Sequence, residues 1–95
     1  MDIAQRKELF KEVKAILKNL KIPKEPVVFL KGQIITNPEM FVKSHVSFVS
    51  SYLENEKLCF PYFIRLIKFV QLIQPTPETE SRINIFMDYI RKTDT

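Results

Sequence analysis

Four polar side chains, carried by two predicted helices, are the residues of this sequence best suited to contact a ligand. They are Ser44, His45, Tyr62 and Arg65. Histidine changes its charge near neutral pH, the two hydroxyl groups donate and accept hydrogen bonds, and arginine pairs with carboxylates and phosphates. The chemistry that these residue types suit is the binding of a small ligand or, for an accessible histidine, proton transfer.

His45 lies within the apolar stripe of its predicted helix, which favours a structural role. The expected core face of that helix comprises Phe41, Phe48, Val49 and Tyr52. A histidine on such a face is usually a core residue with one or two hydrogen bonds. We therefore expect His45 to be largely buried and hydrogen-bonded to a group in or near the following helix, with a ligand-contacting or catalytic role as the alternative. Arg65 is also expected to be structural, stacked on an aromatic ring, bound to a carboxylate or backbone carbonyls, or extended into solvent.

Other patterns that carry chemistry are absent from the sequence. It has no glycine-rich phosphate loop, no nucleophile motif and no Cys/His metal spacing. One histidine and one cysteine cannot build a structural zinc site without carboxylates. Cys59 stands between Leu58 and Phe60, so we expect a buried small apolar residue rather than a nucleophile. The sequence therefore predicts no catalytic residue, no metal and no cofactor, and a non-enzymatic role is favoured over an enzyme.

Charge and hydropathy limit the cellular setting and the partners. The net charge is +4, with 11 acidic residues interspersed among 15 basic ones. Lysines recur on one stripe of the first predicted helix, at Lys7, Lys11, Lys14 and Lys18. An ordinary solvated face is favoured for this stripe, and weak, non-specific nucleic-acid binding at most is expected. Without a signal peptide or membrane span, and with a single cysteine, the sequence indicates a cytoplasmic protein with no membrane contact.

Helix-start signals and apolar periodicity predict one mainly α-helical domain over residues 1–95, a compact four-helix fold with a short β-hairpin between helices one and two. Helices are expected at about 2–20, 38–53, 61–74 and 77–92, with the hairpin at about 27–35. Asp2, Asn37 and Thr76 have the residue types and positions of helix caps, whereas Pro61 marks the start of the third helix. In the hairpin, two β-prone runs flank Lys31-Gly32, which predicts a two-residue turn.

The last predicted helix carries apolar residues beyond one core face. Ile85 and Tyr89 lie together on its far side. A second apolar strip on a small domain is often covered by a partner. We expect self-association, most simply as a two-fold homodimer, with Ile85 and Tyr89 in the contact.

Two clusters of residues resemble a family of small bacterial proteins of unknown function. The clusters are Asn37-Pro38-x-x-Phe41-Val42-x-Ser44-His45 and Pro61-Tyr62-x-x-Arg65-Leu66, within a match that spans about residues 35–73. The resemblance implies no activity, cofactor or partner. It directs attention to Ser44, His45, Tyr62 and Arg65 as the polar positions of that family type.

The leading hypothesis from the sequence is a non-enzymatic binding or interaction module that contacts a protein partner or a second copy. Two alternatives remain open. One is a nucleic-acid-associated accessory protein that uses the lysine stripe, and the other is a small-ligand binder or enzyme built on His45, Tyr62 and Arg65.

Overall fold

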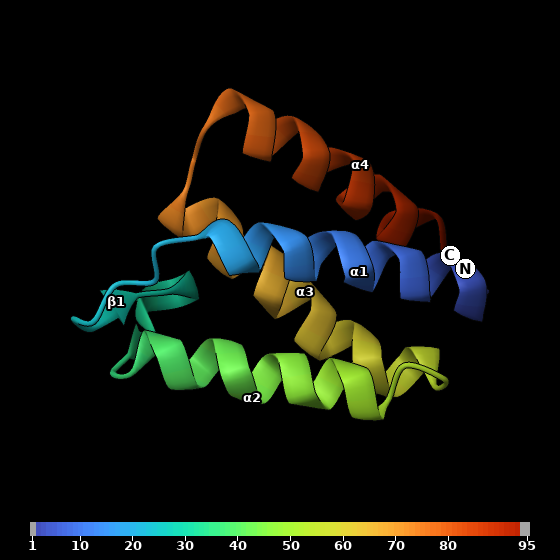
Figure 1. Ribbon diagram of the computed structural model, residues 1–95, viewed down its shortest axis with the longest axis horizontal. Helices are drawn as coiled ribbons and strands as arrows, with labels where there is room; N and C mark the ends of the chain where they lie inside the picture. Colours follow the sequence, from blue (N-terminus) through green and yellow to red (C-terminus); the bar gives the residue numbers. More distant parts are fainter. Residues whose placement is uncertain (1, 94–95) are drawn as a thin grey trace.

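The computed structural model describes residues 2–93, except for the side chains of residues 86, 89, 90, 92 and 93. Within these residues the elements, in chain order, are α1 (Ile3–Asn19), β1 (Val27–Val28), the 3₁₀ turn η1 (Leu30–Gly32), β2 (Ile34–Ile35), α2 (Pro38–Ser51), α3 (Glu56–Ile73) and α4 (Pro77–Thr93). The expected mainly α-helical fold, with four helices and a hairpin between the first two, is confirmed (Figure 1).

The helix starts confirm three of the caps expected from the sequence. The Asp2 carboxylate accepts a hydrogen bond from the Gln5 N–H at 2.8 Å, and the Gln5 side chain accepts one from the Asp2 N–H. The two bonds form a full capping box at the start of α1. The Asn37 side chain accepts from the Met40 N–H at 3.1 Å. The Thr76 hydroxyl accepts from the backbone N–H of Thr79. Each bond satisfies a backbone donor that the helix itself leaves unpaired.

The third helix begins at Glu56, so the prediction that Pro61 starts it is wrong. The Asn55 side chain accepts from the Leu58 N–H at 3.2 Å and caps the helix a full turn before the proline. Pro61 lies inside α3, where it removes one backbone hydrogen bond. The cap and the complete burial of Cys59 in the added turn offset that loss.

The hairpin forms at the expected place, but its turn is longer than predicted. Val27 pairs with Ile35 and Val28 with Ile34, so the connection runs from 29 to 33 rather than through Lys31-Gly32 alone. Residues directly opposite each other point to the same face of a sheet. Ile35 is buried, whereas Val28 and Ile34 are both exposed, and a two-residue turn would have placed Val28 opposite Ile35. The core face of the strands therefore sets the register.

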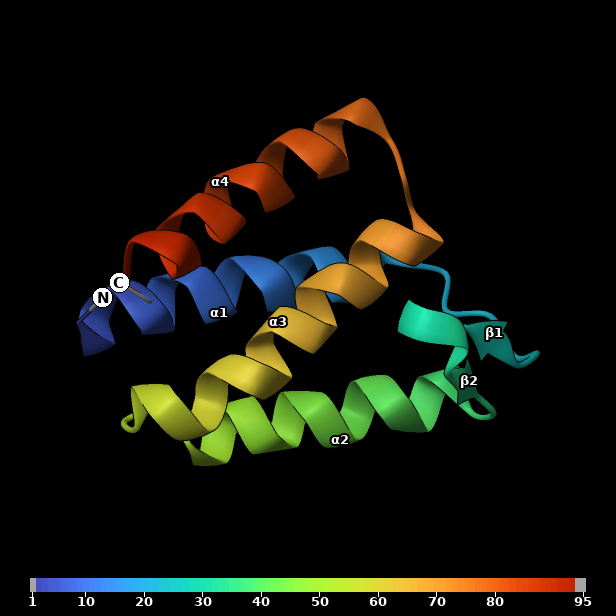
Figure 2. The same ribbon diagram turned by 180° about the vertical axis from the view of Figure 1, so that it is seen from behind.

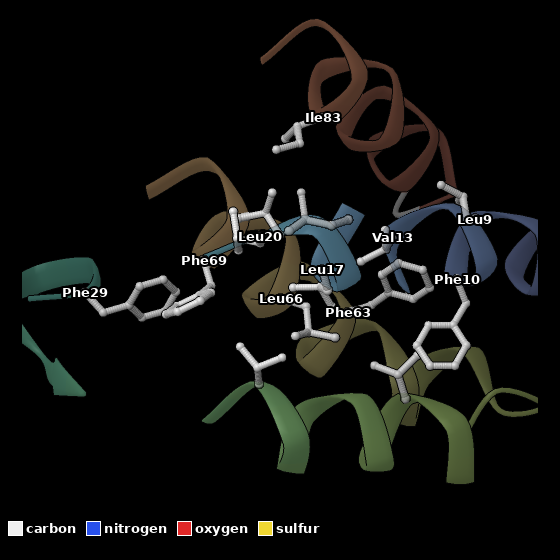
Figure 3. Close-up of a cluster of buried hydrophobic side chains, with 14 of the residues drawn as sticks. Leu9, Phe10, Val13, Leu17, Leu20, Phe29, Phe63, Leu66, Phe69 and Ile83 are labelled. Carbon is white, nitrogen blue, oxygen red and sulfur yellow. The ribbon is translucent and has the colours of Figure 1, made fainter. Parts of the chain in front are cut away.

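Helix α3 is the central element of the molecule. It contacts α1, α2 and α4, and the two opposite views show it crossing between the other helices (Figures 1 and 2). Its nearly continuous apolar surface is typical of a central helix. Figure 3 shows side chains from α1, the hairpin, α3 and α4 converging on one core, and the labelled residues are Leu9, Phe10, Val13, Leu17, Leu20, Phe29, Phe63, Leu66, Phe69 and Ile83.

Candidate functional site

The α2–α3 contact places the only histidine of the sequence in an aromatic layer. We define this aromatic layer by its ring contacts, which join Phe41, His45, Phe48, Tyr52 and Tyr62. His45 is 8% exposed, so its predicted burial is confirmed. Its Nδ1 lies 2.8 Å from the carbonyl oxygen of Phe41, one turn earlier on the same helix. The expectation of a partner in or near α3 is therefore wrong. Because a carbonyl only accepts hydrogen bonds, Nδ1 carries a proton and donates it, and Nε2 of the neutral ring carries the free lone pair.

That second nitrogen, Nε2, is buried and has no hydrogen-bond partner among the described residues. Aromatic rings pack against the imidazole: Phe41 is stacked on it at 4.0 Å between ring centroids, and Tyr62 is in a T-shaped contact at 5.8 Å. Burial lowers the pKa of His45, the Phe41 carbonyl opposes this shift, and the nearby positive charge of Arg65 adds to the lowering. The site therefore favours the neutral imidazole.

Ser44 and His45 are adjacent, but they are not arranged as a nucleophile and its base. The Ser44 hydroxyl donates to the carbonyl oxygen of Phe41 at 3.1 Å. The histidine nitrogen closest to the Ser44 oxygen, at 3.5 Å, is Nδ1, which donates its proton to the same carbonyl. A general base needs a free lone pair directed at the hydroxyl. This geometry gives both side chains a structural role along α2.

Tyr62 and Arg65 join the same layer from α3, so the structure brings the four predicted polar residues together. The Arg65 guanidinium lies 5.6 Å from the centroid of the Phe41 ring, within the range of a cation–π contact. Arg65 thus has one of its expected structural roles. The Tyr62 ring stacks on Phe48 with a centroid distance of 4.7 Å.

The outer edge of this layer differs from the expected core face of α2. Phe48 and Tyr52 are 40% and 39% exposed, whereas Val42, His45 and Val49 are buried. The face of α2 that meets α3 is rotated relative to the one that the aromatic residues indicated. Phe48 and Tyr52 therefore form a half-exposed aromatic surface with Tyr62. In the sequence, the only signal for this surface was that the three residues are aromatic.

A buried arginine that the sequence did not single out holds the other end of the α2–α3 pair. Arg6 of α1 is 6% exposed. Its guanidinium donates to the Leu53 carbonyl at 2.8 Å and to the Glu54 carbonyl at 3.3 Å, and it pairs with the Glu56 carboxylate at 3.4 Å. Arg6 thus ties α1 to the connection between α2 and α3.

The four lysines of the α1 stripe are exposed, and the Lys14 ammonium lies 4.7 Å from the centroid of the Phe10 ring. Ile85 is 55% exposed, whereas the side chain of Tyr89 lies outside the described residues. Nucleic-acid binding and self-association therefore stay predictions.

A second open surface lies at the hairpin and the end of α3. We call it the hairpin surface and define it as Val28, Leu30, Ile34 and Leu72. Val28 and Ile34 are each more than 60% exposed. Between the β1 side of the hairpin and α3 lies a groove of about 320 Å³, the hairpin groove, lined by Val28, Phe29, Leu30, Lys68, Gln71 and Leu72.

The described residues contain neither a metal-binding cluster nor a helix that could span a membrane. No three His, Cys, Asp or Glu side chains within them are grouped to hold a metal ion. No helix among them combines the length and hydropathy needed to cross a membrane.

Comparison with known proteins identifies a family but no activity. The model of a domain of unknown function (DUF6965) matches residues 8–74, from the first helix to the end of α3, and the chain belongs to this family. No curated protein and no solved structure matches the chain. The aromatic layer, the hairpin surface and the groove all lie within the matched segment, whereas α4 lies beyond it.

Proposed function

We propose that this member of a family of unknown function is a non-enzymatic interaction module that binds a protein partner through the hairpin surface. The observation that carries the proposal is the exposure of four large apolar side chains, three of which line one groove. Val28 and Ile34 are opposite each other on the hairpin, and Val28, Leu30 and Leu72 line the same groove. A patch of this kind on a small domain is typical of a surface that a partner covers.

The polar residues support binding rather than catalysis. Ser44 and the Nδ1 of His45 both donate to the Phe41 carbonyl, and the Nε2 of His45 is buried in a ring that packs against Phe41 and Tyr62. A group that performs proton transfer must reach the proton in a substrate complex. The aromatic layer therefore fixes α2 against α3. The end of α3 forms one wall of the groove.

The proposal is tested by selection of binders from an unbiased library of displayed random peptides. Two leucines on α3 provide a matched pair of variants, because Leu72 and Leu58 are 43% and 49% exposed at opposite ends of the helix. We expect the selected peptides to lose affinity for Leu72→Ala and to keep it for Leu58→Ala. Failure to select any binder, or binders that respond equally to the two variants, would overturn the proposal.

A further inference from the structure

One side of the hairpin groove is an open strand edge. The groove is lined by residues of β1 and η1 on that side and by none of β2. In Figure 2 the segment after β1 lies beside the end of α3, whereas β2 lies at the start of α2. The groove is thus bounded by the outer edge of the two-stranded sheet and by a helix.

The backbone of β1 presents hydrogen-bonding groups along that edge. The Phe29 N–H donates to the Gln33 carbonyl across the hairpin. Successive residues of an antiparallel strand direct their N–H and C=O groups to opposite sides. The N–H and C=O of Val28 therefore point away from β2, and no described residue forms a hydrogen bond with them. Such an edge is a template for another extended chain.

The side chains of the groove combine apolar contact with positive charge. Phe29 is buried in the core, and Leu30 and Leu72 give the groove an apolar lining near its opening. Lys68 is the charged side chain among the described lining residues, and Gln71 supplies an amide next to it. An occupant therefore gains from apolar residues together with a carboxylate.

The charge of the groove favours a different chain over a second copy of this one. A two-fold pairing of β1 edges would bring Lys68 of one copy toward Lys68 of the other, in a protein with a net charge of +4. Like charges opposed across a contact are destabilising. A helix is also a poor occupant, because its own backbone hydrogen bonds leave nothing to pair with the strand edge.

We infer that the hairpin groove binds an extended acidic peptide, which adds to β1 as a third strand, buries apolar side chains against Leu30 and Leu72, and places a carboxylate at Lys68. This inference rests on the proposed function and names its partner class. Strand addition gives affinity through main-chain bonds, while side-chain contacts on alternate residues give specificity. The predicted ligand is therefore a segment in which aliphatic and acidic residues alternate.

The test uses labelled peptides of about six residues, the length of an average strand, with blocked ends and with Ile or Val alternating with Glu. Titration is followed by fluorescence anisotropy and by the amide chemical shifts of the isotope-labelled 95-residue chain. We expect binding to shift the amides of residues 28–30 and 68–72. The same peptide with Lys in place of Glu, or with N-methyl groups on the strand-pairing edge, should bind at least about tenfold more weakly, because charge pairing or main-chain bonds are lost.

Two charge reversals on α3 provide the matched variants. Lys68→Glu should lower the affinity for the acidic peptide by about tenfold or more. Lys57→Glu makes the same change in net charge at the exposed start of the helix and should have little effect on that affinity. Equal effects of the two reversals would overturn the inference.

The outcomes separate the inference from the proposed function. Library peptides that depend on Leu72 but have no acidic preference would overturn the inference and leave the interaction module standing. A dimer in light scattering that Leu72→Ala dissociates would identify a second copy as the occupant and would also overturn the inference. If no peptide binds in a way that depends on Leu72, the proposed function itself is overturned.

Discussion

Arg6 and His45 are both buried polar side chains at the α2–α3 pair, yet their surroundings satisfy them to different extents. Arg6 donates to two carbonyl oxygens and pairs with a carboxylate. His45 uses one nitrogen, on its own helix, and the other has no hydrogen-bond partner in the described part of the chain. A buried polar group contributes to stability when its bonding capacity is met, and costs free energy when it is not. Arg6 therefore fixes the connection, whereas His45 contributes mainly the shape of its ring.

The largest expected effect is that of Arg6→Ala. The change leaves two backbone carbonyls and Glu56 without the guanidinium, and we expect a loss of about 3 kcal/mol in the free energy of unfolding, near the lower end for a broken buried pair because the Glu56 side chain is 32% exposed. Urea denaturation followed by circular dichroism measures it.

An exposed arginine provides the control for this change. Arg91 pairs with Asp88 at 3.9 Å with both side chains more than two-thirds exposed, and its replacement by Ala should cost at most about 0.5 kcal/mol. If Arg6→Ala and Arg91→Ala destabilise equally, burial of Arg6 has no energetic consequence and the comparison with His45 fails.

The next effect distinguishes the ring of His45 from its nitrogens. His45→Ala leaves a cavity between Phe41 and Tyr62, and we expect a loss of about 2 kcal/mol. His45→Phe keeps a planar ring and removes the unpaired Nε2, so it should cost less than half as much. Thermal and urea unfolding of both variants provide the measurement. A phenylalanine variant less stable than the alanine variant would show that the nitrogens contribute more than the ring.

The helix starts and Arg6 show which parts of the fold could be predicted from the sequence. Caps such as Asp2-x-x-Gln5 are local, so the starts of α1, α2 and α4 were predictable. The start of α3 was missed because Pro61 is typical of a first turn, while the true cap, Asn55, stood in a polar run. The partners of Arg6 are 47 to 50 residues away in the sequence, so no local pattern indicated its burial.

The candidate site was predictable as a set of residues but not in its geometry. Periodicity placed His45 on a buried face, and Tyr62 and Arg65 on the next helix. The rotation of α2 against α3 then decides which aromatic residues are exposed and which carbonyl the imidazole reaches. The exposure of Val28 and Ile34 was missed for a similar reason, because it depends on a register that the core imposes.

The pH dependence of stability is a smaller effect that isolates His45. Its pKa is lowered in the folded protein below the ordinary value of 6.5, so the unfolded chain binds more protons near that pH. Stability is therefore fully present above 6.5 and falls as the pH drops below it, with a slope of at most about 1.4 kcal/mol per pH unit. The sequence has one histidine, so His45→Phe should abolish the slope just below 6.5. A wild-type curve that is flat between 6.5 and 5.5 would contradict the lowered pKa, and a slope that the variant retains would assign the protonation to another group.

The smallest expected effect concerns Cys59, which lies close to Arg6 in the part of α3 before Pro61. The residue is fully buried, and burial raises the pKa of its thiol more than the charge of Arg6 lowers it, so the thiol stays protonated and apolar in character. Cys59→Ala removes one sulfur from a packed site and should cost about 1 kcal/mol. Cys59→Ser keeps the size more closely but buries a hydroxyl, for which the Glu56 carbonyl that the thiol meets at 3.6 Å is a distant acceptor, and it should cost more than alanine. Urea unfolding of the two variants measures the order, and a serine variant more stable than the alanine variant would show that Cys59, like Arg6, acts through a polar contact.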